Sequence, residues 1–462
     1  MVRKLTLISI FLVFAVFKTI ILLGFIFLSQ INFSQSVYEP VDTASAAFVS
    51  DFLNDLNVRY NEKVKKIKHS FKGKKKKLLL NIYREQHEQL IDKFKSGILY
   101  GDRSMNDYLN RIADTIIASN PTLAGQKVRL YFSRIPETNA FDIGDGIIIV
   151  DLRLLEILDT EAQLAGVISH ELSHYFLHHS DKTFEKRADF LLSDKYRKKM
   201  KAIRRKRYGK YEMFQDLIKK FLYYGSHYSR KFESEADSAG LHLMTHTRYN
   251  PTEMIRAYMH LYDYENRSSD SLSISFLRKI FSVEGKTLKD AVFRAENSPK
   301  TKYQNDHTFF DKDSIKDHPD LKVRISALKR LARQWHLQDK NGKTFLADSA
   351  CFRRLKKIAA YESIYNYYIL KKYGKGLYQT ILLWQDRPDD GFYENMFCRF
   401  VLKLYEAKNN MSLSRYIPGG SSPDDVKSKR VFINLMNKLS LEDWKNLAVS
   451  CRKRLEKIDK TK

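Results

Sequence analysis

The feature that most constrains this chain is the five-residue run His170-Glu171-Leu172-Ser173-His174. Residues four apart on an α-helix lie on one face, so a helix here would bring the rings of His170 and His174 together. Two neutral imidazoles on one face suit zinc, and Glu171 would point near the same site, where it can act on a bound water. A pattern this short also arises by chance in roughly a few per cent of chains of this size, so its surroundings decide the interpretation.

The residues around the run favour a helix that is seated in a core. Val167, Ile168 and Leu172 provide an apolar face, and Asp159 or Thr160 can cap the start of the helix. The alternative is a solvent-facing pair of histidines on an ordinary helix. We interpret the run as a metal site, because it lies inside an amphipathic segment and not in a loop.

A catalytic zinc site needs a third protein ligand. Glu233 and Asp237 lie four apart in a second predicted helix, so Glu233 can bind the metal while Asp237 accepts an N–H from a ligating histidine. The alternative for Glu233 is an exposed acid on a charged helix. Glu235 is predicted to face elsewhere, as a surface or packing residue. His178 and His179 are predicted to be surface residues, because the longer three-histidine metzincin pattern is absent.

The rest of the chain is predicted to be mainly helical, with one short run of strands. Nine prolines and eighteen glycines in 462 residues indicate few long loops, and a hydrophobic content of 43% supports a real core. Alternation at 128–132, followed by apolar runs at 139–141 and 147–150, predicts three strands. Helices are predicted at 40–100, 106–118, 159–178, 181–229, 230–244, 252–264, from 318, 361–372, 376–385, 393–407 and 428–454. The fold class expected is α+β, mainly helical, with a C-terminal all-α region.

The chain carries a net charge of +27, concentrated in basic runs at 63–77 and 195–207. Such charge favours anionic partners, among which an anionic membrane or envelope surface is the one expected, and no nucleic-acid module accompanies it. The alternative is a solvated basic face without a partner. Cys351, Cys398 and Cys451 form no C-x-x-C pair, so one disulfide and a free thiol remain an option in an oxidising compartment.

The first 36 residues decide the expected location of the protein. An apolar stretch from Leu5 to Leu28 is interrupted by Lys18 and follows Arg3 and Lys4. It is read either as a signal peptide or as a membrane anchor, in which Lys18 would be costly. Both interpretations place the rest of the chain outside the cytoplasm, on the periplasmic or extracellular side.

Four segments together resemble one known family, the gluzincin peptidases that include the CAAX prenyl protease and the HtpX-type proteases, in their exported branch. The segments are Asn139 to Val150, Glu161 to His174, Ser229 to Asp237, and His318-Pro319 with Arg324. Their order is that of the family. One departure is the span 181–228, where integral-membrane relatives have transmembrane helices and this chain is strongly basic.

The resemblance implies a role for each matching residue. His170, His174 and Glu233 would bind one zinc ion, and Glu171 would be the general base. Asp237 and Arg230 would support the ligands, and His318 would reach the active site, with a plain helix start as its alternative role. The strand near Ile147, with Asn139 and Ala140, would be the edge that pairs with an extended substrate.

We therefore expect a zinc metalloendopeptidase of the zincin type that acts in envelope protein quality control. The alternative is a chaperone or assembly factor for envelope proteins. The expected domains are a signal or anchor at 1–36, a basic helical segment at 37–100, a peptidase domain at 101–335 and a helical region at 340–462. One helical pair in that last region resembles a tetratricopeptide hairpin.

Overall fold

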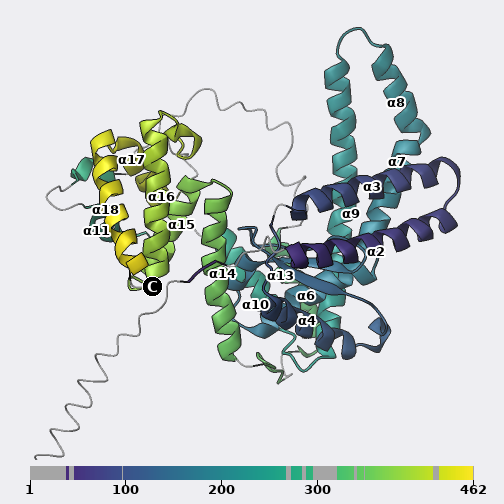
Figure 1. The fold of residues 1–462 in the computed structure, drawn as a ribbon. Coiled ribbons are helices and arrows are strands. Elements are labelled where there is room, and N and C mark those ends of the chain that lie inside the picture. Colours follow the sequence, from purple (N-terminus) through teal and green to yellow (C-terminus); the bar gives the residue numbers. More distant parts are fainter. Residues whose placement is uncertain are drawn as a thin grey trace, which may run out of the picture.

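The computed structural model of the protein describes most of the chain in nine stretches. These are residues 38–40, 46–95, 97–266, 272–282, 288–294, 320–337, 341–347, 349–419 and 426–460. The predicted N-terminal signal or anchor and His318 lie outside the described residues. Figure 1 shows the arrangement, with the first half of the chain forming a body and two projecting helical hairpins.

A three-stranded sheet lies at the centre of this body. β1 (Arg129–Ser133) pairs in parallel with β3 (Ile147–Asp151), and β2 (Ala140–Asp142) pairs with β3 in the antiparallel sense. The strand order is therefore β1-β3-β2. All three strands fall where the alternation and the apolar runs predict them.

The sheet corrects the expected position of the substrate edge. Ile147 lies on β3, the central strand, and both sides of that strand are paired. A central strand has no free row of backbone groups, so the prediction of an edge at Ile147 is wrong. The parallel pairing with β1 leaves no signal in the local sequence, which explains the error. The edge strand is β2, which holds Ala140 and follows Asn139, and no described strand adds to its outer side.

Helices cover both faces of the sheet. α4 (Arg103–Ala118) and α6 (Glu161–Phe176) pack on one face, and α2 (Ala46–Ser70) and α3 (Gly73–Lys95) pack on the other. The first face contributes Leu130, Phe132, Ile148 and Val150 to the core. The second contributes Ile147 and Ile149, which meet Phe52, Leu56 and Phe94. Because β3 is buried on both faces, its first four residues are all apolar.

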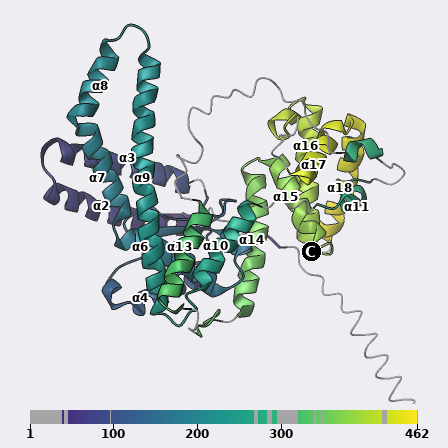
Figure 2. The same ribbon diagram turned by 180° about the vertical axis from the view of Figure 1, so that it is seen from behind.

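Three further helices surround α6. α9 (Lys210–Thr245) and α10 (Glu253–Glu265) pack directly on it, and α13 (Leu321–Gln334) packs on both of them. Figure 2 shows this group from behind, at the base of the longer hairpin. The group places the predicted ligands of α6 and α9 face to face.

Two hairpins project from the body. One is α2–α3, and the other joins α7 (His179–Leu192) and α8 (Asp194–Arg205) to the first half of α9, with its tip at residues 206–209. The two hairpins contact each other where α3 meets α7, through a small core that contains Ile67, Leu79, Ile82, Tyr83 and Ala188. The basic runs of the sequence therefore lie on extended arms and not on the compact body.

The C-terminal helices build a second core. They are α14 (Ser349–Ile369), α15 (Tyr373–Gln385), α16 (Gly391–Asn409), α17 (Lys427–Lys438) and α18 (Leu441–Lys460). Shorter elements are α5 (Leu152–Ile157), α11 (Ile274–Phe281), η1 (Pro121–Leu123), η2 (Asp290–Phe293) and η4 (Leu413–Arg415). α14 joins the two cores, because Phe352 and Leu355 pack with the first and Ile364 and Tyr367 with the second.

Two features of this region differ from the sequence pattern. The helix predicted over 428–454 is two helices, because Ser440 accepts a hydrogen bond from the Asp443 amide (3.1 Å) and donates its own amide to that carboxylate (3.0 Å). This reciprocal cap starts α18. In addition, α11 lies inside the predicted peptidase segment but packs in the second core through Leu277 and Ile280. The domain boundaries themselves stay a prediction.

In the described part of the chain, no helix is both long enough and apolar enough to cross a membrane.

Candidate metal site

The predicted ligands converge from two helices. The Nε2 atoms of His170 and His174 in α6 lie 3.1 Å apart, and Glu233 reaches both from α9. Its Oε1 lies 3.2 Å from His174 Nε2, and its Oε2 lies 3.5 Å from His170 Nε2. His170 and Glu233 are buried, and His174 is partly exposed, so the cluster has a deep side and an open side.

The separations fit a zinc ion. Ligand atoms at 2.0–2.1 Å from a tetrahedral centre lie about 3.3 Å from each other. The two imidazole nitrogens are 3.1 Å apart, and each lies 3.2 or 3.5 Å from a different oxygen of Glu233. The donor set of two imidazoles and one carboxylate is also one that catalytic zinc uses. The side chains therefore fit zinc, with room for a further ligand on the open side.

Close packing of α6 against its neighbours fixes the distance between the ligand helices. A Cβ on Gly240 of α9 would lie 3.0 Å from the backbone nitrogen of His170, so any larger residue here would push α9 and the ligand helix apart. One turn earlier on α6, a Cβ on Gly166 would lie 2.7 Å from Cα of Met254 in α10. The metal site thus depends on two small residues that carry no ligand.

The start of α6 is fixed by a local cap and by hydrogen bonds from two tyrosines that are distant in the sequence. Thr160 caps the helix by accepting a hydrogen bond from the Gln163 amide (3.2 Å), as the sequence allows. Glu161 is buried and accepts hydrogen bonds from the hydroxyls of Tyr108 (2.5 Å) and Tyr249 (2.6 Å). These contacts anchor the helix that carries the metal ligands.

A buried charge cluster supports His170. Asp237 Oδ1 lies 2.9 Å from His170 Nδ1, as the spacing from Glu233 predicts. Arg324 of α13 contacts both oxygens of Asp237, at 2.8 and 2.6 Å, and its Nη1 lies 3.1 Å from Glu233 Oε2. The hydroxyl of Tyr258 donates to Asp237 (2.7 Å) and accepts from Arg324 (2.8 Å). The Nε2 of His170 is thereby aimed at the metal position.

The same cluster sets the ionisation of its members. Burial alone would raise the pKa of Asp237, but the Arg324 guanidinium and the hydrogen bonds hold that pKa well below its usual range. Burial and Arg324 lower the pKa of His170, and its hydrogen bonds to Asp237 and Glu233 outweigh them, which raises the pKa to about 9. In the metal-free protein a proton therefore competes for the nitrogen that would bind zinc.

His174 has different neighbours. Its Nδ1 lies 3.0 Å from Nδ1 of His179, and Nε2 of His179 lies 3.2 Å from Oε2 of Glu235. Only 3% of His179 is exposed, so the prediction that it is a surface residue is wrong, whereas His178 is exposed as expected. Residue spacing could not predict this burial, because α6 ends at Phe176 and the first residue of α7, His179, lies next to His174.

The candidate base lies between the metal cluster and the edge strand. Oε1 of Glu171 is 3.9 Å from His170 Nε2, and Oε2 accepts a hydrogen bond from the backbone amide of Asp142 (3.1 Å). Burial and the charge of Glu171 raise the pKa of the Asp142 carboxyl to about 7, against hydrogen bonds from Gly144 and Ser180. Sequence reasoning missed Asp142, which sits at the last position of β2.

The edge strand turns selected backbone groups outward. Asp151 donates its amide to the carbonyl of Asn139, and Ile143 donates to the carbonyl of Ile147. In an antiparallel pair, alternate residues face the partner strand, so Asn139 and Ile143 face β3 while Ala140 faces away. The N–H and C=O of Ala140 therefore point away from β3, and no described residue is bonded to them.

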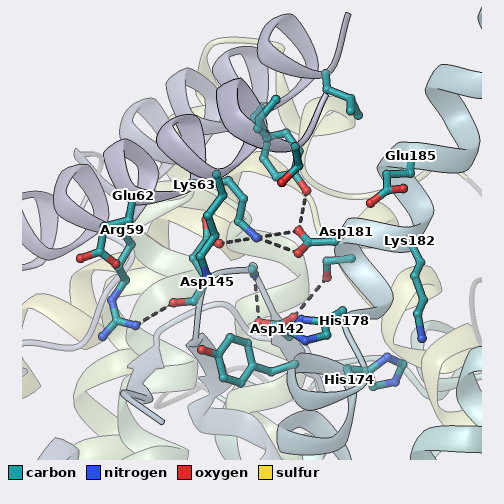
Figure 3. A pocket seen from close by; sticks show the side chains of 18 of the residues that line it. Arg59, Glu62, Lys63, Asp142, Asp145, His174, His178, Asp181, Lys182 and Glu185 are labelled. Atoms are coloured by element: carbon teal, nitrogen blue, oxygen red, sulfur yellow. Dashed lines mark hydrogen bonds and ion pairs between the residues drawn. The ribbon is translucent and has the colours of Figure 1, made fainter. Parts of the chain in front are cut away.

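A cavity of about 710 Å³ opens beside His174. The α2–α3 hairpin, the β2–β3 turn and the start of α7 line it (Figure 3). Lys63 of α2 ties these parts together, since its Nζ lies 2.8 Å from Asp145 and 2.7 Å from Asp181. The basic hairpin thus forms one wall of a cavity that is also lined by His174, one of the three candidate ligands.

Arg230 does not take the supporting role that the family resemblance implies. Arg230 is exposed on α9, and the arginine that contacts the ligand cluster is Arg324, which the sequence marked only as part of the family pattern. His318 is outside the described residues, and its role stays a prediction. Tyr258 had no sequence signal, because a tyrosine within a helix is an ordinary core residue.

Comparison with known proteins agrees with this geometry. The model of peptidase family M48 matches residues 103–332, and no curated protein matches the chain. The matched segment begins with α4 and ends within α13, so it contains His170, Glu171, His174, Glu233 and Arg324. M48 peptidases are zinc-dependent. Through this segment, the chain belongs to peptidase family M48, a family of zinc metallopeptidases.

Proposed function

We propose that this protein is a zinc metalloendopeptidase that cleaves peptide bonds within protein substrates. The observation that carries the proposal is the placement of Glu171 between a His-His-Glu cluster and a free edge strand. A metal cluster alone would serve a structural site equally well. A carboxylate beside the metal position and a strand that can bind a peptide backbone are what hydrolysis needs in addition.

Each group of the site has a separate role in the proposed hydrolysis. Zinc, when bound, polarises the scissile carbonyl and lowers the pKa of the attacking water. Glu171 takes the proton from that water and passes it to the leaving amine. The amide of Asp142 holds one oxygen of Glu171, which leaves the other directed toward the metal cluster. Ala140 holds the substrate backbone in the extended form that edge strands bind.

The Glu171→Gln variant tests this assignment. The amide keeps the shape and the contact with Asp142 but cannot accept a proton, so we expect cleavage of an unfolded protein to fall at least about 100-fold. Zinc content should stay at one ion per chain. Glu88→Gln, an exposed position on α3, is the matched control and should cleave like the wild type. Wild-type cleavage by the Glu171 variant would refute the role of this residue.

We further propose that the substrates are proteins of the cell envelope. The proposal rests on the apolar N-terminal stretch, which predicts export, and on the open edge strand, which suits unfolded chains. Fractionation of cells that express the full chain tests the location. Recovery of the protein in the cytoplasm alone would refute it.

The tip of the α8–α9 hairpin supports an anionic membrane surface as a partner. Residues 195–211 contain no acidic side chain and are basic at most positions. Tyr208 and Tyr211 at the tip are 77% and 71% exposed. Clustered lysine and arginine attract anionic headgroups, and tyrosine is enriched at the membrane–water interface. The tip combines both at the point of the arm that lies far from the body (Figure 1).

Vesicle binding tests the membrane proposal. We expect co-sedimentation with vesicles of phosphatidylcholine and phosphatidylglycerol, but not with phosphatidylcholine alone. Arg204→Glu with Arg205→Glu should abolish it, whereas Arg452→Glu with Lys453→Glu, the same charge change on α18, should not. Equal losses in both variants would show that overall charge and not the tip binds. Preference of the tip for single-stranded DNA over vesicles would also overturn the proposal.

A further inference from the structure

A second pair of residues stands behind the open side of the metal site. His179 lies between His174 and Glu235, with nitrogen–nitrogen and nitrogen–oxygen distances of 3.0 and 3.2 Å. Neither His179 nor Glu235 belongs to the His170-His174-Glu233 cluster. The three side chains form a line that starts at the metal position and ends at a carboxylate on α9.

The chemistry of the groups sets the direction of the hydrogen bonds along this line. A carboxylate only accepts, so Nε2 of His179 must donate to Glu235. A neutral imidazole has one N–H, so Nδ1 of His179 must then accept, and Nδ1 of His174 must donate to it. That leaves the lone pair of His174 on Nε2, the atom that faces His170 and Glu233.

The fold holds His179 in this position. His178 has a left-handed backbone (φ 55°), which ends α6 and turns the chain so that α7 begins at His179. The ring of His179 stacks on Phe232, with centroids 4.3 Å apart and planes 14° from parallel. Phe232 directly precedes the ligand Glu233 on α9. The stack thus ties the ring to the same helix that supplies the third ligand.

We propose that His179 and Glu235 are positioning residues that fix the tautomer and orientation of His174 for metal binding. The proposal rests on the metal site put forward above, and it adds a support that the ligand pattern does not contain. Hydrogen-bond partners of this kind change metal affinity by about 10- to 100-fold when they are removed. In this proposal Glu235, although partly exposed, orients His179 and through it His174.

Two substitutions of His179 separate positioning from packing. His179→Phe keeps an aromatic ring that can stack on Phe232 but has no nitrogen to accept from His174. His179→Asn loses the stack but keeps a carbonyl oxygen near the position of Nδ1. If hydrogen bonding matters, the Phe variant should bind zinc at least about 10-fold more weakly, and the Asn variant should keep more of the affinity. If packing matters, the order should reverse.

The measurement is zinc affinity of the full chain by competition with a chromogenic chelator, together with the visible spectrum of the cobalt-substituted protein. Metal-free thermal unfolding identifies a variant that fails to fold. Glu235→Ala then provides an independent arm, because this side chain is 39% exposed and its loss should not disturb the fold. We expect Glu235→Ala to weaken zinc binding and to shift the cobalt spectrum.

Lys231→Ala is the matched control. Lys231 is the exposed neighbour of Glu235, at 3.7 Å, and contacts neither histidine. Its variant should bind zinc like the wild type. Wild-type affinity in both His179→Phe and Glu235→Ala would overturn the proposal. A wild-type chain that binds zinc but cleaves no protein would refute the proposed function instead, and the affinity comparison would still decide the role of His179.

Discussion

The two histidine ligands are held by contrasting surroundings. His170 lies in a buried ionic cluster, where Asp237 and Arg324 are 5% and 8% exposed. His174 lies on the open side, where it contacts the neutral ring of His179. His179 in turn donates to Glu235, which is 39% exposed. The deep side is part of the core between α6, α9 and α13, whereas the open side faces the cavity.

This contrast predicts how the two sides respond to substitution. Buried charges are expensive to leave unpaired, so changes on the deep side should lower both the stability of the fold and the affinity for zinc. Exposed charges contribute little to stability, so loss of Glu235 on the open side should lower zinc affinity alone. The deep side should therefore determine both the stability of the site and its zinc affinity, and the open side only the zinc affinity.

The largest effect is expected from Arg324→Ala. It leaves the carboxylates of Glu233 and Asp237 buried without the guanidinium, which should lower the free energy of unfolding by about 3–5 kcal/mol. Zinc brings positive charge to Glu233, so the loss should be smaller in the zinc-loaded protein. Urea unfolding with and without zinc measures both values. Arg330→Ala, exposed on the same helix, should change neither, and an equal loss at both positions would contradict the role of the cluster.

Asp237→Ala against Glu235→Ala tests the contrast directly. Asp237→Ala removes the partner of His170 and one partner of Arg324, so zinc affinity should fall by about 10- to 100-fold and stability by about 2 kcal/mol. Glu235→Ala should weaken zinc binding by about 10-fold or less, with an unchanged melting temperature. If both variants lose the same stability, the two sides of the site do not differ in the way proposed.

The sequence predicts the ligand cluster because both of its halves are local. His170 with His174, and Glu233 with Asp237, are pairs at helical spacing, and helix geometry alone puts each pair on one face. The three strands and the cap at Thr160 also follow from local patterns. In these parts of the fold, the local sequence alone determines the secondary structure and which side chains share a face.

The parts that the sequence does not predict depend on contacts between distant segments. Parallel pairing of β1 makes β3 central, so Ile147 does not lie at the edge of the sheet, whereas Ala140 of β2 does. The left-handed turn at His178 brings His179 back to His174, although helical periodicity places it past the helix end. The break before α18 depends on Ser440, whose capping role an apolar pattern cannot show.

Gly240→Ala and Gly166→Ala compare two contacts of the ligand helix. The new methyl at 240 would press on the backbone of His170, and the one at 166 on Met254. Each should cost about 1–3 kcal/mol of stability through overpacking. Only Gly240→Ala moves α9, and with it Glu233, relative to the histidines. Zinc affinity should therefore fall in that variant and stay near wild type in Gly166→Ala, as measured by chelator competition.

The smallest effect concerns two aspartates whose pKa values move in opposite directions. Arg324 lowers the pKa of Asp237, whereas no cation of the described residues forms an ion pair with Asp142, and burial raises its pKa to about 7. A raised pKa means that the folded state holds the proton more tightly than the unfolded state does. The stability that Asp142 contributes is therefore present at low pH and is lost as the pH rises from about 4 to about 7.

Asp142→Asn should remove this pH dependence. Its amide can still accept from the Gly144 backbone and donate to Ser180, so the local contacts survive. Because Asp142 is mostly buried but keeps some contact with solvent, which screens its charge, we expect a gain of about 1 kcal/mol at pH 8 that disappears toward pH 4. Urea unfolding across this range measures it. A gain that is equal at both pH values would mean that the folded state does not raise the pKa of Asp142, and the predicted contrast with Asp237 would then be wrong.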